Sequence, residues 1–269
     1  MASRSRRPAS PALTGTALVE ALLGGWRALS RLEVDGFAVL RSGGVTRRAN
    51  SVVPLEPSSD PGVLDAAVTR IEVLLDAAGE RPAFRLFTGE GLDHEPVRAA
   101  LAQRGYEQDA PVHVLQRALS DHRTAPDSRA AITVGAPPED WLEASWRLAP
   151  RPEEGARETL RDLMAGTPAL YLALEDPDSA GRGPLAVGRA ALVPHRRRTI
   201  AVLHQIAVDP ERRREGLGRA VVRSLLSLSA VQGADLALLE VETGNAAARA
   251  LYRGERFAPA GECRYLTRP

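Results

Sequence analysis

The segment from Ile206 to Ala220 holds the residues whose types and spacing best suggest chemistry. An apolar run ends at Val208, and a stretch rich in arginine and glycine then leads into a helix-forming pattern over 217–231. Backbone N–H groups at a helix start lack intrahelical partners and lie at the positive end of the helix dipole, so they bind phosphate well. Gly216 and Gly218 carry no Cβ and let a ligand approach the backbone closely. The segment therefore predicts a diphosphate site at the start of a helix.

Lysine is absent from the chain. A Walker-type P-loop needs a lysine that reaches the terminal phosphates of a nucleotide. The composition therefore argues against a nucleoside triphosphatase and favours a loop that binds phosphate without transferring it.

This loop, Arg213-x-x-Gly216-x-Gly218 after an apolar strand, resembles the acetyl-CoA loop of the GCN5-related N-acetyltransferases, the GNAT family. A second segment further along the chain is similar to the family's N-x-x-A-x-x-L-Y-x-x-x-G-F pattern. Its matching residues are Asn245, Ala248, Leu251, Tyr252 and Phe257. Arg256 stands where the family has a glycine, which leaves open how the preceding helix ends.

The resemblance implies an α/β (α+β) fold with a mixed sheet, acetyl-CoA as co-substrate and an amine as acceptor. In the family, N–H groups of the strand before the loop align the acetyl group and the pantetheine arm, which here implicates Ile206, Ala207 and Val208. The resemblance assigns the pyrophosphate to the loop and helix start, at Arg213, Arg214, Gly216, Gly218 and Arg219. Asn245 either caps the next helix or contacts the pantetheine amide.

Acetyl transfer needs a neutral amine and a proton donor for the departing thiolate. Tyr252 lies where many family members have a tyrosine near the thiol sulfur, so the resemblance implies a general acid; alternatively it is a half-buried aromatic that closes the helix against the sheet. His204 lies where some arylalkylamine acetyltransferases carry a histidine base. Its ordinary pKa of about 6.5 suits that role, although a strand histidine is more often packed or hydrogen-bonded. Glu240 and Glu242 are the alternative bases.

Composition sets the broad class of the protein. The chain has 269 residues, of which 44% are apolar, and its formal net charge is +1. Such a balance gives no field for capturing nucleic acid. No apolar run is long enough for a membrane span and no signal-peptide core follows the N-terminus, so we expect a cytoplasmic protein. The use of arginine in place of all lysine indicates a GC-rich bacterial genome.

Cysteine and histidine usage predicts neither a disulfide nor a metal site. Cys263 is the single cysteine, which excludes an intramolecular disulfide. The five histidines show no metal-ligand spacing and have no cysteine partners.

Apolar periodicity predicts two successive α/β halves. A polar tail at 1–12, expected to be disordered, precedes the first half at 13–119, and a polar linker at 120–130 leads to the second half at 131–269. The predicted helices cover 17–29, 63–78, 92–104, 139–148, 153–164 and 217–231. The predicted strands cover 32–40, 49–53, 83–87, 112–119, 132–134, 169–174, 185–193, 200–208 and 236–241, and the first two are joined by a turn at 42–44.

The ends of the two halves are alike. Leu101-x-x-x-Gly105-Tyr106 before a strand parallels Leu251 to Phe257 before the last strand, which predicts a pseudo-repeat of two GNAT-like domains. Any strand–helix–strand unit could also align this loosely. The segment 52–62 stands where the phosphate loop stands in the second half, but it has no arginine and contains two acids and three prolines. Negative charge and missing N–H donors there predict that the first half does not bind CoA.

Two further arginine clusters lie outside this pattern. The polar stretch 47–51 interrupts an apolar context and could line the interdomain cleft and select substrate. Residues 196–198 lie between two predicted strands and therefore indicate a solvated hairpin tip, with contact to the CoA 3′-phosphate, an acidic acceptor or RNA as alternatives.

Two hypotheses for function follow. The first is an N-acetyltransferase, monomeric or homodimeric, in which the degenerate first half shapes the acceptor pocket and a primary amine attacks acetyl-CoA directly in a ternary complex. Its tandem organisation resembles that of the mycothiol synthases, whose acceptor is a small sugar-linked amine, so a small-molecule acceptor is expected. The second is a catalytically silent CoA-binding sensor, and a protein N-acetyltransferase is also left open.

Overall fold

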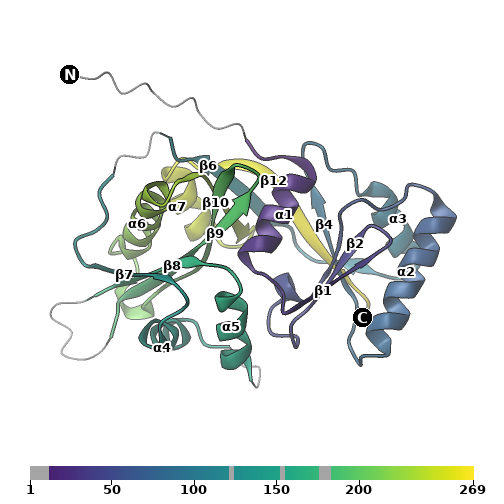
Figure 1. Ribbon diagram of the computed structural model, residues 1–269, viewed down its shortest axis with the longest axis horizontal. Helices are drawn as coiled ribbons and strands as arrows, with labels where there is room; N and C mark the ends of the chain where they lie inside the picture. Colours follow the sequence, from purple (N-terminus) through teal and green to yellow (C-terminus); the bar gives the residue numbers. More distant parts are fainter. Residues whose placement is uncertain (1–11, 121–123, 152–154, 176–182) are drawn as a thin grey trace.

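The computed structural model describes residues 12–120, 124–151, 155–175 and 183–269. In this part of the chain a single 12-stranded mixed sheet receives strands from both halves (Figure 1). From edge to edge its strands are β1 (Ser30–Val34), β2 (Phe37–Arg41), β3 (Val52–Pro54), β4 (Ala83–Thr88), β12 (Ala258–Thr267), β6 (Val112–Ala118), β11 (Ala234–Glu242), β10 (Arg198–Val208), β9 (Ala186–His195), β8 (Ala169–Leu174) and β7 (Ala130–Gly135). The short strand β5 (Glu107–Gln108) pairs with β12. The predicted tail at 1–12 lies almost wholly outside the described residues.

Helices cover both faces of this sheet. The α-helices of the described residues are α1 (Gly15–Gly25), α2 (Pro61–Asp76), α3 (Glu95–Gln103), α4 (Glu139–Leu148), α5 (Ala156–Ala165), α6 (Leu217–Val231) and α7 (Ala246–Gly254). Two short 3-10 turns, η1 (Arg47–Ala49) and η2 (Pro210–Arg212), follow β2 and β10. In Figure 1, α1 lies in the middle of the molecule, with α6 and α7 on one side and α2 and α3 on the other.

Each half places its last strand beside the other half. The last strand of the first half, β6, pairs with β11, and the last strand of the second half, β12, pairs with β4. The two exchanged strands also pair with each other. The preceding strands correspond, since β3 pairs in parallel with β4 and β10 pairs in parallel with β11. This topology is compatible with the expected pseudo-repeat, and backbone hydrogen bonds run continuously from one half to the other.

The alternation of side chains along the strands explains why the sheet needs two covering layers. Along β8, Leu170, Leu172 and Leu174 lie in one apolar cluster with α6, whereas Tyr171 and Ala173 lie in another with α1, α4 and α5. Successive strand residues point to opposite faces, so both faces of β8 are buried. The second of these clusters also includes residues of β2, β3 and β4, so α1 packs into a core that both halves share.

The two halves end their last helices in the same way. The N–H of Tyr106 donates to the carbonyl of Leu101 after α3, at 3.1 Å, and the N–H of Phe257 donates to the carbonyl of Tyr252 after α7, at 3.0 Å. By these hydrogen bonds, the position of Leu101 in the first half corresponds to that of Tyr252 in the second half, and not to that of Leu251. The sequence parallel between the two segments is therefore shifted by one residue.

Arg256 adopts the backbone conformation of the glycine that it replaces. Its φ of 60° is in the left-handed region, as is the φ of 79° at Gly105 in the first half. A residue with a Cβ loses about 1 to 2 kcal/mol in this conformation. Helix α7 thus ends at Gly254, and the chain turns at Arg256 without a glycine.

Most predicted elements have the expected type, and α4, β8 and α6 have the predicted bounds. The single strand predicted at 32–40 is wrong, because β1 and β2 form a hairpin there. Asp35 and Gly36 at its turn have φ values of 48° and 82°. An Asp-Gly pair favours such a two-residue turn, and the apolar run on either side obscured it. The helix predicted at 17–29 ends earlier, at Gly25, because β1 begins at Ser30.

The division into domains at 120–130 stays a prediction. β6 ends at Ala118 and β7 begins at Ala130, and residues 121–123 between them lie outside the described residues. The strand exchange shows that any two domains would share one sheet.

A buried arginine fastens the central helix to the second half. Arg189 of β9 donates to the carbonyl of Gly25 at the end of α1 at 2.9 Å. It also donates to the carbonyl of Met164 in the last turn of α5 at 3.0 Å and to that of Thr167 after this helix at 3.2 Å. Its Nε also lies 3.3 Å from the hydroxyl of Tyr171. The C-terminal ends of helices attract cations, and both α1 and α5 end beside this guanidinium group. Their carbonyl oxygens accept the hydrogen bonds that water would accept if the group were exposed. Burial nevertheless lowers the pKa of Arg189 below its ordinary value.

We expect Arg189→Met to lower the free energy of unfolding by about 3 kcal/mol or more, because several buried carbonyl oxygens would lose their donor. Urea denaturation followed by circular dichroism measures the change. Arg197→Met, at an exposed hairpin tip, is the matched control and should change stability by less than about 0.5 kcal/mol. Equal stabilities of the two variants would show that Arg189 does not hold the helices.

Candidate functional site

Strands β10 and β11 separate in the second half. Their parallel ladder ends at Leu203 and Leu239, after which β10 stays paired with β9 and β11 stays paired with β6. The register with β9 shifts between His204 and Ala207, where Gln205 has a φ of 50°. We call this point the strand fork. Beyond it, the backbone of 206–208 has no ladder to β11, as a strand that must bind a ligand through its N–H groups requires.

The predicted phosphate loop leads from the strand fork into α6. Gly216 has a φ of 82°, and a Cβ added there would meet no atom within 4 Å, so glycine is needed for backbone conformation. At Gly218 an added Cβ would lie 3.2 Å from Leu251, so glycine allows α6 and α7 to pack closely. Arg213 and Arg214 are exposed. The first N–H groups of α6 and two exposed guanidinium groups therefore lie together beside the end of β10.

Arg219 has a structural partner. Its Nε lies 3.3 Å from Glu255, whose buried carboxylate is also 3.0 Å from Nε of Arg223 and 3.8 Å from Arg117 of β6. The three arginines fasten α6 and β6 to the end of α7. Only the exposed part of the Arg219 guanidinium remains for a phosphate.

Asn245 and Tyr252 stand at the two ends of the short helix α7. The Asn245 side chain accepts the N–H of Ala248 at 3.0 Å, so it caps the helix, as one of its two expected roles requires. Tyr252 is 9% exposed, and its ring centroid lies 5.8 Å from that of Phe257. Burial raises the pKa of Tyr252 to about 12, against the opposing charge of Arg48. The hydroxyl is therefore protonated at neutral pH and can donate its proton.

His204 lies beneath the end of α1. It is 6% exposed, and its ring centroid lies 5.2 Å from that of Trp26. Its Nε2 has no hydrogen-bond partner among the described residues, and a Cβ added at Gly25 would lie 2.7 Å from it. Burial, and then the charges of nearby arginines, lower the pKa of His204 well below its ordinary value. The imidazole is therefore neutral, and its role as a base stays a prediction.

Glu240 is buried against arginines of the first half. Arg48 donates through Nε to Glu240 at 3.0 Å, Arg85 of β4 also donates to it, and Cys263 Sγ lies 3.4 Å away. Burial alone would raise the pKa of Glu240, but the charges of Arg85 and Arg48 outweigh it and lower the pKa to about 2. A carboxylate this acidic is a weak base. The other alternative base, Glu242, lies at the exposed end of β11.

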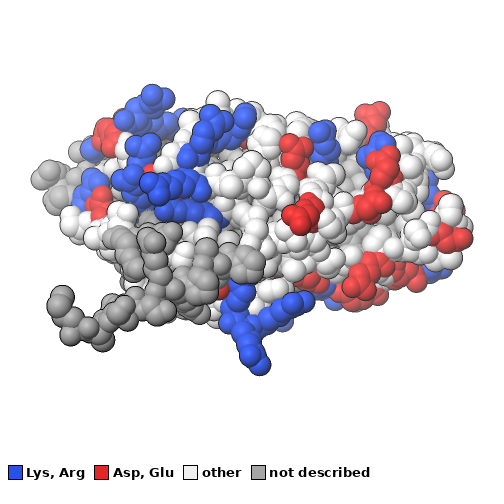
Figure 2. Space-filling model, turned by 90° about the horizontal axis from the view of Figure 1, so that it is seen from above, with Lys and Arg blue, Asp and Glu red and all other residues white. Residues whose placement is uncertain are grey.

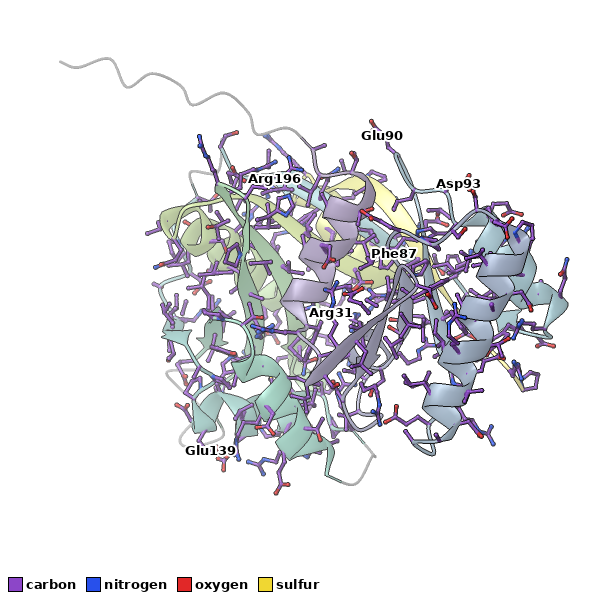
Figure 3. The ribbon with its side chains drawn as sticks, turned by 45° about the vertical axis from the view of Figure 1, so that its right-hand side comes forward. Arg31, Phe87, Glu90, Asp93, Glu139 and Arg196 are labelled. Atoms are coloured by element: carbon purple, nitrogen blue, oxygen red, sulfur yellow. The ribbon has the colours of Figure 1, made fainter. Side chains whose placement is uncertain are left out.

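Arg85 and Arg189 are site residues that the sequence reasoning missed. Arg85 is 1% exposed, and its guanidinium carbon lies 4.7 Å from the ring centroid of Phe87. Phe87 lies in the middle of the molecule, whereas Arg196 and Glu139 lie at its periphery (Figure 3). The available signal was an arginine inside each of two otherwise apolar strands.

Polar side chains form a buried row across the sheet. Tyr171, Arg189 and His204 are register partners on β8, β9 and β10, and Glu240 follows Leu239 on β11 at the strand fork. The row contains cationic, neutral and anionic groups on one face of the sheet. The first half supplies the arginines that complete it.

The first half lacks an open helix start at the corresponding position. Asp60 caps α2 by accepting the N–H of Val63 at 2.9 Å, and Pro61 occupies the first helical position. A carboxylate thus already occupies the place of an anionic ligand, which supports the expectation that this half does not bind CoA. Figure 2 shows a matching charge distribution, with basic side chains over the α6 and α7 side and acidic side chains over the α2 and α3 side.

The predicted hairpin tip is confirmed. β9 ends at His195 and β10 begins at Arg198, so Arg196 and Arg197 form the turn, and Arg196 has a φ of 55°. Arg198 itself lies in β10 and pairs with Asp235 at 3.1 Å.

Within the described ranges, no cluster of three or more histidine, cysteine or acidic side chains could hold a metal ion. None of the helices described there has the length and apolar character needed to cross a membrane.

Comparison with known proteins relates the chain to acetyltransferases. Residues 16–266 match the model of the family described as "Probable histone acetyltransferase Rv0428c C-terminal". The mycothiol acetyltransferase of Clavibacter michiganensis is 33% identical over 181 residues, which cover 62% of this chain and 57% of that protein. The chain thus spans little more than half the length of this relative.

Two solved structures share the fold. A GCN5-related N-acetyltransferase from Kribbella flavida superposes with a TM-score of 0.67 at 18% identity and covers 96% of this chain and 97% of its own. A tandem GNAT protein from the clavulanic acid biosynthesis pathway gives a TM-score of 0.63 at 14% identity and covers 98% of this chain and 90% of its own. The expected GNAT-like fold is therefore confirmed.

We expect Glu240→Gln to lower the free energy of unfolding at pH 7 by about 3 kcal/mol, because the buried guanidinium group of Arg85 and the partly exposed one of Arg48 would lose their counter-charge. The folded pKa of about 2 lies below the ordinary value of 4.5, so this stabilisation is complete above about pH 5 and is lost as the pH falls toward 2. Denaturation curves between pH 3 and 7 should therefore converge for wild type and variant at the acid end. Glu242→Gln on the same strand is the control, and a pH-independent difference for Glu240→Gln would contradict the assignment.

Proposed function

Because the chain belongs to the Rv0428c C-terminal acetyltransferase family and is a member of the GCN5-related N-acetyltransferases, we propose that it transfers the acetyl group of acetyl-CoA to a primary amine. The observation that carries the proposal is the adjacency of the strand fork to the start of α6. The strand fork offers N–H groups of β10 to a thioester and its amide arm. The start of α6 offers helix N–H groups to a diphosphate.

The coenzyme would bind along the second half. Its pantetheine arm and acetyl group would lie against the backbone of 206–208, and its diphosphate would lie at the start of α6. The residues that we assign to the diphosphate are Arg213, Arg214, Gly216, Gly218 and, through its exposed part, Arg219. Asn245, which caps α7, would contact the pantetheine amide through its remaining amide group.

The chemistry would be a direct displacement in a ternary complex. The amine nitrogen attacks the thioester carbon, and the carbon–sulfur bond breaks as the amide forms. Tyr252, which is protonated at neutral pH, donates a proton to the departing thiolate. We assign the proton that the amine loses to the neutral imidazole of His204, through a water molecule because the ring is buried. Its lowered pKa makes His204 a weaker base than an exposed histidine.

The first half would shape the acceptor side of the site. It supplies Trp26, whose ring packs against that of His204. It also supplies Arg48 and Arg85, which bind the carboxylate of Glu240. Because relatives include enzymes that are named for the small molecule mycothiol, we propose a small-molecule amine as acceptor. The family description, which names histones, makes a protein amine the second candidate. We expect the protein to act in the bacterial cytoplasm, as a monomer or homodimer.

Two measurements on the purified protein test this function. Calorimetry with acetyl-CoA should detect binding, and free thiol should appear when a panel of amines is added. Binding without thiol release for any small or peptide amine would support the silent sensor instead. Absence of binding to both acetyl-CoA and CoA would refute both functions.

Arg213→Ala should weaken acetyl-CoA binding about ten- to a hundredfold, because a charge-assisted hydrogen bond to phosphate contributes about 1.5 to 3 kcal/mol. Calorimetric titration of wild type and variant gives the ratio of dissociation constants. Arg197→Ala removes another exposed arginine, at the opposite end of the 11-residue strand β10 from the loop, and should leave the affinity unchanged. Equal affinity of Arg213→Ala and wild type would remove the loop from the coenzyme site.

Tyr252→Phe should lower kcat by about a hundredfold or more while changing the affinity for acetyl-CoA little, because general acid catalysis contributes about 10² to 10⁴ in rate. Steady-state thiol release at saturating acetyl-CoA provides kcat. Tyr106→Phe, which removes a hydroxyl bonded to Glu72 in the first half, is the matched control. An unchanged kcat in Tyr252→Phe would leave Tyr252 with only its packing role.

A further inference from the structure

The polar cluster around Glu240 carries more positive than negative charge. Two guanidinium groups, from Arg48 and Arg85, bind one carboxylate. The neighbouring titratable groups add no negative charge at neutral pH, because burial raises the pKa of both Cys263 and Tyr265 to about 12. The cluster therefore has one guanidinium group more than it has carboxylates, and such an excess of positive charge favours an anionic ligand.

The two arginines differ in their access to solvent. Arg85 has a side chain that is 1% exposed, lies over the rings of Phe87 and Tyr265, and is committed to Glu240. Arg48 has a side chain that is 31% exposed. Its hydrogen bond to Glu240 uses Nε, so the terminal nitrogens at the other edge of the guanidinium remain for a second acceptor. Arg48 is therefore the group through which the surplus charge meets a ligand.

Arg48 also lies at the proposed reaction centre. Glu240, which Arg48 binds, follows the last residue of β11 that pairs with β10 at the strand fork. The positive charge of Arg48 also contributes to lowering the pKa of His204 and opposes the rise in the pKa of Tyr252. Ser51, on the same loop, has a buried hydroxyl without a hydrogen-bond partner among the described residues. An anion bound by Arg48 would thus lie beside the groups to which we assign proton transfer.

We propose that the acceptor amine carries an anionic group, a carboxylate or a phosphate, and that Arg48 binds this group and selects the acceptor. This inference rests on the function proposed above. The guanidinium fork matches the oxygens of either anion. The first half of the chain thereby contributes the specificity-determining residue, from the turn η1. The amine end of the same molecule points toward the strand fork.

Matched pairs of small amines test the proposal by binding, independently of turnover. β-Alanine is compared with β-alaninamide, and O-phosphoethanolamine with ethanolamine, by calorimetry on the CoA-saturated protein. We expect the anionic member of at least one pair to bind about tenfold more tightly or better, since the extra interaction is a charge-assisted hydrogen bond. The pair that shows the preference identifies carboxylate or phosphate.

Variants then assign the preference to Arg48. In Arg48→Gln the ratio of dissociation constants within the preferred pair should fall to about one, and Arg48→Lys should restore part of it because the charge returns. Arg98→Gln, which removes an arginine paired with Glu95 at the start of α3, is the control and should keep the wild-type ratio. Arg85 still pairs with Glu240 in the Arg48 variants, so the buried carboxylate keeps a partner.

Several results would overturn the proposal. Equal binding of both members of each pair to the wild-type protein does so without any variant. An unchanged preference for the anionic amine in Arg48→Gln would also overturn it. So would a variant that keeps this preference but binds CoA more weakly, because Arg48 would then bind the coenzyme. Failure of the proposed function appears elsewhere, as absent acetyl-CoA binding or absent thiol release.

Discussion

The carboxylate of Glu240 is held in the interior of the protein by guanidinium groups that belong to the other half of the chain. Arg85 reaches it from β4 and Arg48 from the turn η1, while Glu240 itself lies where β10 and β11 part. A lone carboxylate would not stay ionised at this depth, so the strand fork keeps its charge pattern only while both halves are in contact. The neutral imidazole of His204 follows from the same arrangement, because burial and the nearby cations both oppose its protonation.

Much of the second half could be predicted because its signals are local. The helix over 217–231 has a regular apolar stripe, and Gly216 immediately precedes it, so the helix and its start could be predicted from the sequence. The capping role of Asn245 could be predicted for the same reason. Such features depend on residues a few positions apart, for which periodicity and residue type are sufficient.

The groups that make the site electrostatically unusual could not be predicted, because they meet across long sequence distances. Arg85 and Glu240 are brought together by the exchange of β6 and β12, and no local pattern encodes that exchange. Glu240 could be considered a base from the sequence alone, but its partners make it a structural anion. The hairpin at Asp35 and Gly36 differs from these groups, because its turn signal is local and was overlooked only because apolar residues lie on both sides of it.

The reciprocal placement of β6 and β12 also bears on synthesis of the chain by the ribosome. When the first half has emerged, β4 still lacks the neighbour that β12 will provide, and β6 has no partner until β11 is made. The nascent first half therefore exposes two unpaired strand edges for as long as translation of the second half takes, and such edges favour aggregation. Chaperone binding to this nascent segment would protect it until the last strand completes the sheet.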